Sequence, residues 1–164
     1  MKIELSKDAF SEIDDEFAEA VNQYKWSLHS KGYAYRQADI DGERRTILLH
    51  RYVMELAGRE PGFRTDHINK DRLDNRLENL RAATASQNAV NSKLRANNKS
   101  GFRGVCWESG KWLAKIKVNY VPIRLGRFDD KIAAARAYDA AARAVWPDFA
   151  VLNFPESETL GMAA

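Results

Sequence analysis

The amino-acid sequence predicts an α+β protein made of two modules. Residues 65–91 read as two short strands separated by a polar loop and followed by a helix. Residues 102–155 contain three strand patterns followed by one long helix pattern, so they predict a three-stranded antiparallel sheet packed on one helix. A β-rich stretch precedes the first module. We expect these segments: 1–91 for the first module with its lead-in, 92–101 for a basic polar linker, 102–155 for the second module and 156–164 for a flexible tail.

Composition limits the classes of protein to which the chain can belong. It has 164 residues, 45% of them hydrophobic and 30% charged, with a mean hydropathy of −0.54. No apolar run approaches the roughly 18 residues that cross a bilayer, and the first residues lack the apolar core of a secretory signal. The single cysteine, Cys106, allows neither an internal disulfide nor a cysteine zinc knuckle. We expect a cytoplasmic protein with no membrane partner.

Positive charge is concentrated in the middle of the chain. Residues 63–127 contain 14 Lys and Arg against 5 Asp and Glu, a net charge of +9, whereas the remainder contains 12 against 18. A basic region between acidic ends is the electrostatic footprint of a protein that binds a polyanion.

The N-terminal 47 residues are predicted to be a β-rich lead-in. Asp41-Gly42 is a strong hairpin signal between strand patterns at 33–40 and 44–48. The aromatic side chains of this segment, Trp26 among them, are expected to lie mainly in a core. A helix pattern follows at 48–57. No chemistry is assigned to the lead-in.

Residues 65–91 read TDHINKDRLDNRLENLRAATASQNAVN and carry the candidate catalytic group. We expect strands at 65–69 and 80–84, a tight loop through Asp74-Asn75, and a helix capped by Thr84 or Ser86. In this geometry Asp66 on the first strand and Asn88 on the helix can converge, with His67 beside them.

Such a group suits metal-assisted attack on a phosphodiester. Mg²⁺ or Mn²⁺ prefers oxygen ligands and keeps several waters, so Asp66 and Asn88 would hold the ion. A histidine can take a proton from the attacking water near neutral pH, which makes His67 the candidate general base. The side-chain oxygen of Asn79 would accept a hydrogen bond from the other ring nitrogen and orient the imidazole.

The pattern DHINxDxLDNRxxNLRxxTxxxN over residues 48–91 resembles the HNH endonucleases, specifically the phage-type homing branch with the ββα-metal fold. The resemblance implies His67 as the base, Asn79 as its orienter, and Asp66 and Asn88 as metal ligands. It also implies a mobile element of a phage or bacterium. Related enzymes carry a His-Arg pair where this chain has His50, which would contact the scissile phosphate, lie near the metal, or be a packed structural histidine.

The linker and the second module indicate a DNA-binding region. Ten extended residues reach roughly 30 Å, close to one turn of B-DNA at about 34 Å. In residues 112–118 apolar and basic side chains alternate, which predicts a half-buried strand with a basic outer face. Asp129 or Asp130 would cap a helix at 131–145. Basic side chains along the strands suit a DNA major groove: Arg103, Lys115, Lys117, Arg124 and Arg127.

The motifs FRGV, GKW, LGRFD, AARAYDAAA and VLNFP resemble the plant ethylene-response-factor DNA-binding domain. The resemblance implies that the sheet reads double-stranded DNA through Arg and Trp side chains. It adds Trp107 and Tyr138 to the candidate DNA-binding residues. Cys106 and Glu108 stand where that family usually has Arg, and Arg124 where it has Trp, so the family's GC-rich target is not transferred.

The sequence therefore predicts a site-specific, metal-dependent DNA endonuclease whose C-terminal domain chooses the target. The alternatives are a DNA-binding regulator with an inactive nuclease remnant, an RNA-binding protein and an interaction domain without a nucleic-acid role. A monomer and a weak homodimer are both open, as are nicking and double-strand cleavage. The target sequence, the physiological metal and the element of origin are also open.

Overall fold

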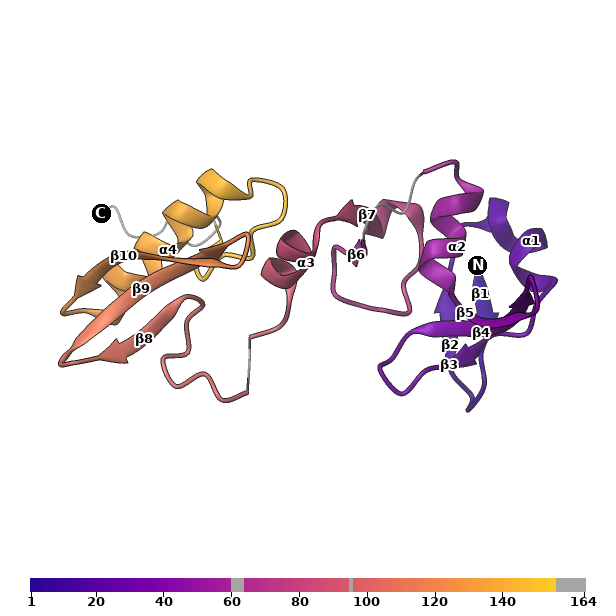
Figure 1. The fold of residues 1–164 in the computed structure, drawn as a ribbon, viewed down its shortest axis with the longest axis horizontal. Coiled ribbons are helices and arrows are strands. Elements are labelled where there is room, and N and C mark those ends of the chain that lie inside the picture. Colours follow the sequence, from indigo (N-terminus) through magenta and orange to yellow (C-terminus); the bar gives the residue numbers. More distant parts are fainter. Residues whose placement is uncertain (60–63, 95, 156–164) are drawn as a thin grey trace, which may run out of the picture. The chain divides into compact units, whose positions relative to one another are not determined.

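The computed structural model describes residues 1–59, 64–94 and 96–155, and the predicted tail at 156–164 lies outside them. The chain divides into two compact units, Met1–Asn88 and Ala89–Ala164 (Figure 1). The architecture is mixed α and β, with four α-helices in the described part. None of the helices in the described ranges is long and apolar enough to cross a membrane.

The first unit begins with two small antiparallel sheets. Strands β1 (Lys2–Glu4) and β2 (Phe10–Glu12) form one sheet, and β3 (Ser27–Leu28), β4 (Ala34–Ile40) and β5 (Glu43–Leu48) form the other. Between them lie η1 (Asp15–Phe17) and α1 (Ala18–Asn22), and α2 (Leu49–Leu56) follows the second sheet. The predicted Asp41-Gly42 hairpin is confirmed, since both residues have positive φ and join β4 to β5.

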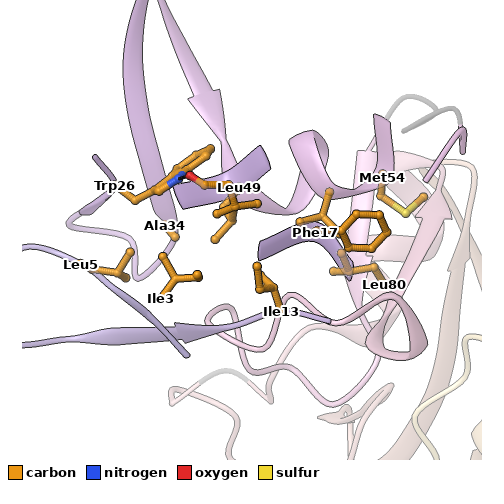
Figure 2. Packing of buried hydrophobic residues seen from close by; sticks show 11 residues of the cluster. Ile3, Leu5, Ile13, Phe17, Trp26, Ala34, Leu49, Met54 and Leu80 are labelled. Atoms are coloured by element: carbon orange, nitrogen blue, oxygen red, sulfur yellow. Dashed lines mark hydrogen bonds between the residues drawn. The ribbon is translucent and has the colours of Figure 1, made fainter. Parts of the chain in front are cut away.

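The core of the first unit gathers apolar side chains from the lead-in, from α2 and from one later strand. Leu49 and Val53 are fully buried one helical turn apart on α2. Trp26 is buried as expected, and its indole N–H donates to the carbonyl of Val21 at 2.9 Å. Figure 2 shows that Leu80 belongs to the same cluster. The strand that carries Leu80 is therefore fastened to the lead-in by apolar burial.

The predicted strand, loop, strand and helix are present with slightly shorter bounds. Strand β6 (Arg64–His67) pairs antiparallel with β7 (Leu80–Ala83), η2 (Leu77–Asn79) ends the loop, and α3 (Ala85–Asn91) follows. Thr84 is confirmed as the cap of α3. Its hydroxyl accepts from the N–H of Gln87 at 3.2 Å, and the Gln87 side chain accepts from the N–H of Thr84 at 2.8 Å. This is a reciprocal capping box.

The second unit contains a three-stranded antiparallel sheet in the order β10-β9-β8, with one helix along it (Figure 1). Its elements are β8 (Val105–Glu108), β9 (Lys111–Val118), β10 (Val121–Phe128) and α4 (Lys131–Val145). Asp130 caps α4 by accepting from the N–H of Ala133 at 2.8 Å. Small side chains on α4, Ala134 and Ala135 among them, are fully buried in the core shared with the sheet, so the helix can lie close to the strands.

Two boundaries of the second unit differ from the sequence prediction. In the module predicted at 102–155 the first strand starts only at Val105, because Gly104 has a φ of +69°, which is not an extended conformation. A Cβ at Gly104 would lie 2.0 Å from Cδ2 of Tyr138, so only glycine fits there. Within the predicted linker, Ser100 is buried and its hydroxyl donates to the carbonyl of Val105 at 2.8 Å. The end of that segment therefore packs on the sheet and is not extended.

Candidate functional site

His67 lies at the end of β6 and is almost completely buried. Its Nε2 atom is 3.0 Å from the side-chain oxygen of Asn75. Burial lowers the pKa of His67, and the hydrogen bond to Asn75 and the negative charge of Asp66 only partly oppose this effect. The ring is therefore neutral near neutral pH, the state in which a histidine can accept a proton.

Asn79 does not have the role predicted for it from the sequence, which was to orient the imidazole of His67. Its side-chain oxygen accepts from the N–H of Asn69 at 2.9 Å, and its side-chain amino group donates to the carbonyl of Asp74 at 2.7 Å. Both groups are thus used to close the loop between the two strands. Asn75 occupies the place predicted for Asn79, because the loop turns the earlier asparagine toward the ring.

An ion pair between Arg76 and Asp74 stabilises the loop between β6 and β7. Arg76 donates from Nε and from Nη2 to the two carboxylate oxygens of Asp74, both at 2.8 Å. The side chain of Asn69 also donates to Asp74, at 2.8 Å. These hydrogen bonds, led by the one from Arg76, hold the pKa of Asp74 below its usual value. The loop that carries Asn75 and Asn79 is therefore held by side chains as well as by backbone.

Asp66 is buried, and the guanidinium of Arg81 donates to its Oδ2 atom from Nε at 3.0 Å and from Nη2 at 2.9 Å. The two residues are direct cross-strand partners. Sequence reasoning missed Arg81, although the antiparallel pairing of the two predicted strands was the signal that could have revealed it. Arg81 offsets the cost of burying the carboxylate.

Asn88 lies in the middle of α3 and is partly exposed. Its backbone N–H donates to the carbonyl of Thr84 at 3.0 Å, which closes the first turn of the helix. No three His, Cys, Asp or Glu side chains of the described residues gather as a metal cluster. The carboxylate of Asp66 and the side-chain amide of Asn88 offer the oxygen atoms that Mg²⁺ or Mn²⁺ prefers, so their donor chemistry fits the ion predicted from the sequence.

His50 is buried on α2, and its ring meets that of His67 edge to face with the centroids 5.1 Å apart. The ring of Tyr33 lies 5.4 Å from it. Burial, followed by electrostatic repulsion between protonated His50 and its neighbours His67 and Arg51, lowers the pKa of His50 to about 3. Among the roles predicted for His50, this environment favours the packed, neutral structural histidine.

The low pKa of His50 predicts acid sensitivity of the fold. An unfolded chain takes up a proton on this histidine below about pH 6.5, whereas the folded chain resists it down to about pH 3, so stability is lost as the pH falls through this window. We expect the free energy of unfolding of the metal-free protein to fall by about 2 kcal/mol between pH 7 and pH 5 on account of His50. Urea denaturation measures this loss.

The matched control is a histidine outside this cluster. His50→Phe should make the decline with pH shallower, whereas His29→Gln should leave its slope unchanged. Equal slopes in the parent and in His50→Phe would contradict the assignment.

The four basic candidates on the strands of the second unit share one face of the sheet. Lys115 and Arg124 are direct cross-strand partners. Lys117 lies two positions after Lys115 and is therefore on the same face. Arg127 pairs across the strands with Leu113, which lies two positions before Lys115, so Arg127 is on this face as well. All four are exposed, while α4 covers the other face. Glu108 interrupts this basic face, since its carboxylate lies 3.4 Å from the guanidinium of Arg124.

Three other candidate DNA-binding residues lie elsewhere. Trp107 pairs with Trp112, whose side chain packs on the core under α4, so Trp107 belongs to the face opposite the basic one. The guanidinium of Arg103 donates to the carbonyls of Val90 and Ser92. Tyr138 is buried against Gly104. The sequence motifs placed these residues in the domain but could not show their contacts.

Two regions of the chain are similar to known proteins. Residues 48–90 match the family model of the HNH endonucleases. An uncharacterized HNH endonuclease of Acanthamoeba polyphaga mimivirus is 29% identical over 136 residues, which cover 81% of this chain and 68% of the viral protein.

The C-terminal region is weakly similar to plant DNA-binding domains of the ethylene-response-factor type. The dehydration-responsive element-binding protein 2A of Arabidopsis thaliana is 43% identical over 67 residues, 38% of this chain and 19% of the plant protein. An ethylene-responsive transcription factor of the same plant is 34% identical over 85 residues, 46% of this chain and 34% of the plant protein. The chain thus spans only about a fifth to a third of these two relatives.

Proposed function

From the HNH endonuclease domain that the chain carries at residues 48–90, we propose that this protein is a homing-type DNA endonuclease that uses a single divalent metal ion. The observation that carries the proposal is the buried pair Asp66 and His67 at the end of β6, in which the imidazole is neutral and already held by a hydrogen bond. A preorganised base beside a carboxylate is what hydrolysis of a phosphodiester requires.

In the proposed reaction each residue has one role. His67 takes the proton of the attacking water. Asp66 and Asn88 would hold the ion, which supplies Lewis-acid stabilisation of the charge that builds on the phosphate. Arg81 fixes the Asp66 carboxylate in place through Oδ2. Asn79 and Asp74 close the loop, and Asn75 holds the imidazole.

The second unit would choose the target. A sheet with exposed Lys115, Lys117, Arg124 and Arg127 on one face can enter a major groove, where Arg binds guanine and Lys binds phosphates. Glu108 on the same face can accept from the amino group of cytosine. This chemistry makes double-stranded DNA the proposed partner.

One observation favours a second candidate function, a DNA-binding regulator without nuclease activity. The Oδ2 atom of Asp66 is already engaged by Arg81, so a cation would have to share the carboxylate with a guanidinium. In a regulator, the ion pair would simply stabilise the hairpin, and the chain would bind duplex DNA without cutting it.

The decisive experiment is relaxation of a supercoiled plasmid library by the full chain. We expect nicking or linearisation with Mg²⁺ or Mn²⁺ and none with EDTA. Asp66→Asn and Asn88→Ala should lower activity by at least about 10²-fold, because even loss of a residue that only hydrogen-bonds to a metal ligand costs a metal site up to that much. Raised Mn²⁺ should partly restore activity by mass action.

Matched variants are Asp39→Asn and Asn97→Ala, which change exposed residues of the same types and should retain full activity. Binding of duplex DNA without metal-dependent cleavage under any of these conditions would replace the endonuclease by the regulator.

A further inference from the structure

A chain of hydrogen bonds runs from His67 into the N-terminal lead-in, a segment for which the sequence predicts no chemistry. The side-chain oxygen of Asn75 is 3.0 Å from Nε2 of His67, and the amino group of Asn75 donates to the hydroxyl oxygen of Ser11 at 2.7 Å. The Ser11 hydroxyl in turn donates to the carbonyl of Leu73 at 2.8 Å. Ser11 lies on β2, 64 residues before Asn75 in the sequence.

The direction of this chain is set at its far end. The Leu73 carbonyl can only accept, so the single hydroxyl hydrogen of Ser11 must point to it. The Ser11 oxygen can then only accept from Asn75, which turns the amino group of Asn75 toward Ser11 and its oxygen toward the imidazole. An oxygen that only accepts requires a hydrogen on Nε2 of His67. The unprotonated nitrogen of neutral His67 is therefore Nδ1.

Burial makes this direction hard to reverse. Ser11 and Asn75 are both 0% exposed and His67 is 5% exposed, so water does not compete for these groups. Reversing the chain would place the lone pairs of the Ser11 oxygen against the Leu73 carbonyl, and an unmade hydrogen bond between buried groups is costly. The opposite tautomer of His67 should be disfavoured by about tenfold or more.

The backbone holds β2 and the loop together independently of these side chains. The N–H of Glu12 donates to the same Leu73 carbonyl at 2.7 Å, and the N–H of Asn75 donates to the carbonyl of Glu12 at 2.7 Å. Removal of the Ser11 hydroxyl therefore leaves the loop attached to β2, which allows a test of the hydroxyl by itself.

We infer that Ser11 and Asn75 are positioning residues that fix His67 as the Nε2–H tautomer and present Nδ1 as the proton acceptor. The effect on cleavage rests on the proposed endonuclease function, whereas the tautomer itself does not. The N-terminal hairpin is then part of the catalytic apparatus through Ser11, in addition to supporting the fold.

The test is nitrogen NMR of the ring atoms in the metal-free, ¹⁵N-labelled full chain at about pH 8. His67→Gln identifies the His67 signals. In the parent, Nε2 should carry the hydrogen and Nδ1 should show the shift of an unprotonated ring nitrogen. In Ser11→Ala the side-chain amide of Asn75 can flip. The ratio of the Nε2–H tautomer to the Nδ1–H tautomer of His67 should therefore fall by about tenfold. Ser11→Thr, which keeps the hydroxyl, should restore the ratio.

Asn79→Ala is the matched control, because it weakens the loop without removing a group bonded to the ring, and it should leave the tautomer unchanged. A hydrogen on Nδ1 in the parent, which needs no variant to fold, would overturn the inference, as would an unchanged ratio in Ser11→Ala.

Cleavage separates this inference from the proposed function. If both hold, Ser11→Ala should lower kcat about tenfold with little change in KM. If the parent has the expected tautomer and does not cleave DNA, the positioning role stands and the endonuclease proposal fails.

Discussion

Replacement of His67 by alanine is expected to lower DNA cleavage by about 10²-fold to 10⁴-fold, the usual contribution of a general base. The substitution removes the only group proposed to take the proton from water, and it leaves every exposed cation of the sheet in the second unit untouched. Affinity for duplex DNA should therefore stay within about twofold. Plasmid relaxation measures the first quantity and gel mobility shift at matched salt measures the second.

Two further variants separate chemistry from folding. His67→Gln keeps a buried polar side chain of similar length and should be as inactive as the alanine variant. His29→Ala changes a histidine outside the candidate site and should remain active. If binding and cleavage were lost together in both His67 variants, the residue would have a structural role. Full cleavage by His67→Gln would exclude it as the base.

Simultaneous replacement of Lys115, Lys117 and Arg124 by alanine is expected to weaken DNA binding by about 10²-fold near physiological salt. Each phosphate contact contributes about 0.9 to the slope of log affinity against log salt, so loss of the two lysine contacts should make the slope shallower by about 1.8. Cleavage at low salt should persist with weaker site preference, because the candidate active site lies in the other unit. A salt titration of affinity, followed by mapping of the cut positions, checks both.

The matched control removes the same charge from other surfaces. Lys2, Lys25 and Lys131 are exposed, and Lys131 belongs to α4, which covers the opposite face of the sheet. The triple alanine variant of these lysines should change the salt slope by less than about one. Equal losses in the two triple variants would show that net charge matters and that the basic face is no specific binding surface.

Much of the fold could be predicted because its signals are local. The Asp41-Gly42 turn, the capping box of Thr84 and Gln87, and the alternation along residues 112–118 each depend on residues a few positions apart. Such patterns determine where an element begins and which of its faces is buried. They do not determine which residue of another element it meets.

The candidate site shows the difference most clearly. The sequence by itself identified His67, Asp66 and the hairpin that carries them, because their types and spacing are one continuous pattern. It could not distinguish Asn75 from Asn79 as the partner of the imidazole, since both lie in the same polar loop and only its path turns one side chain toward the ring. Asp66 meets Arg81 through strand register.

Only the tertiary structure shows that Ser11 lies at the site. It also shows that Arg103 and Trp107 do not lie on the basic face of the sheet. Ser11 and Asn75 are 64 residues apart, and burial of Ile3, Ile13 and Leu80 in one core is what places β2 beside the loop. Because that burial depends on surface shared by distant elements and not on any one motif, the sequence determined which chemical groups are present, and packing decided which of them meet.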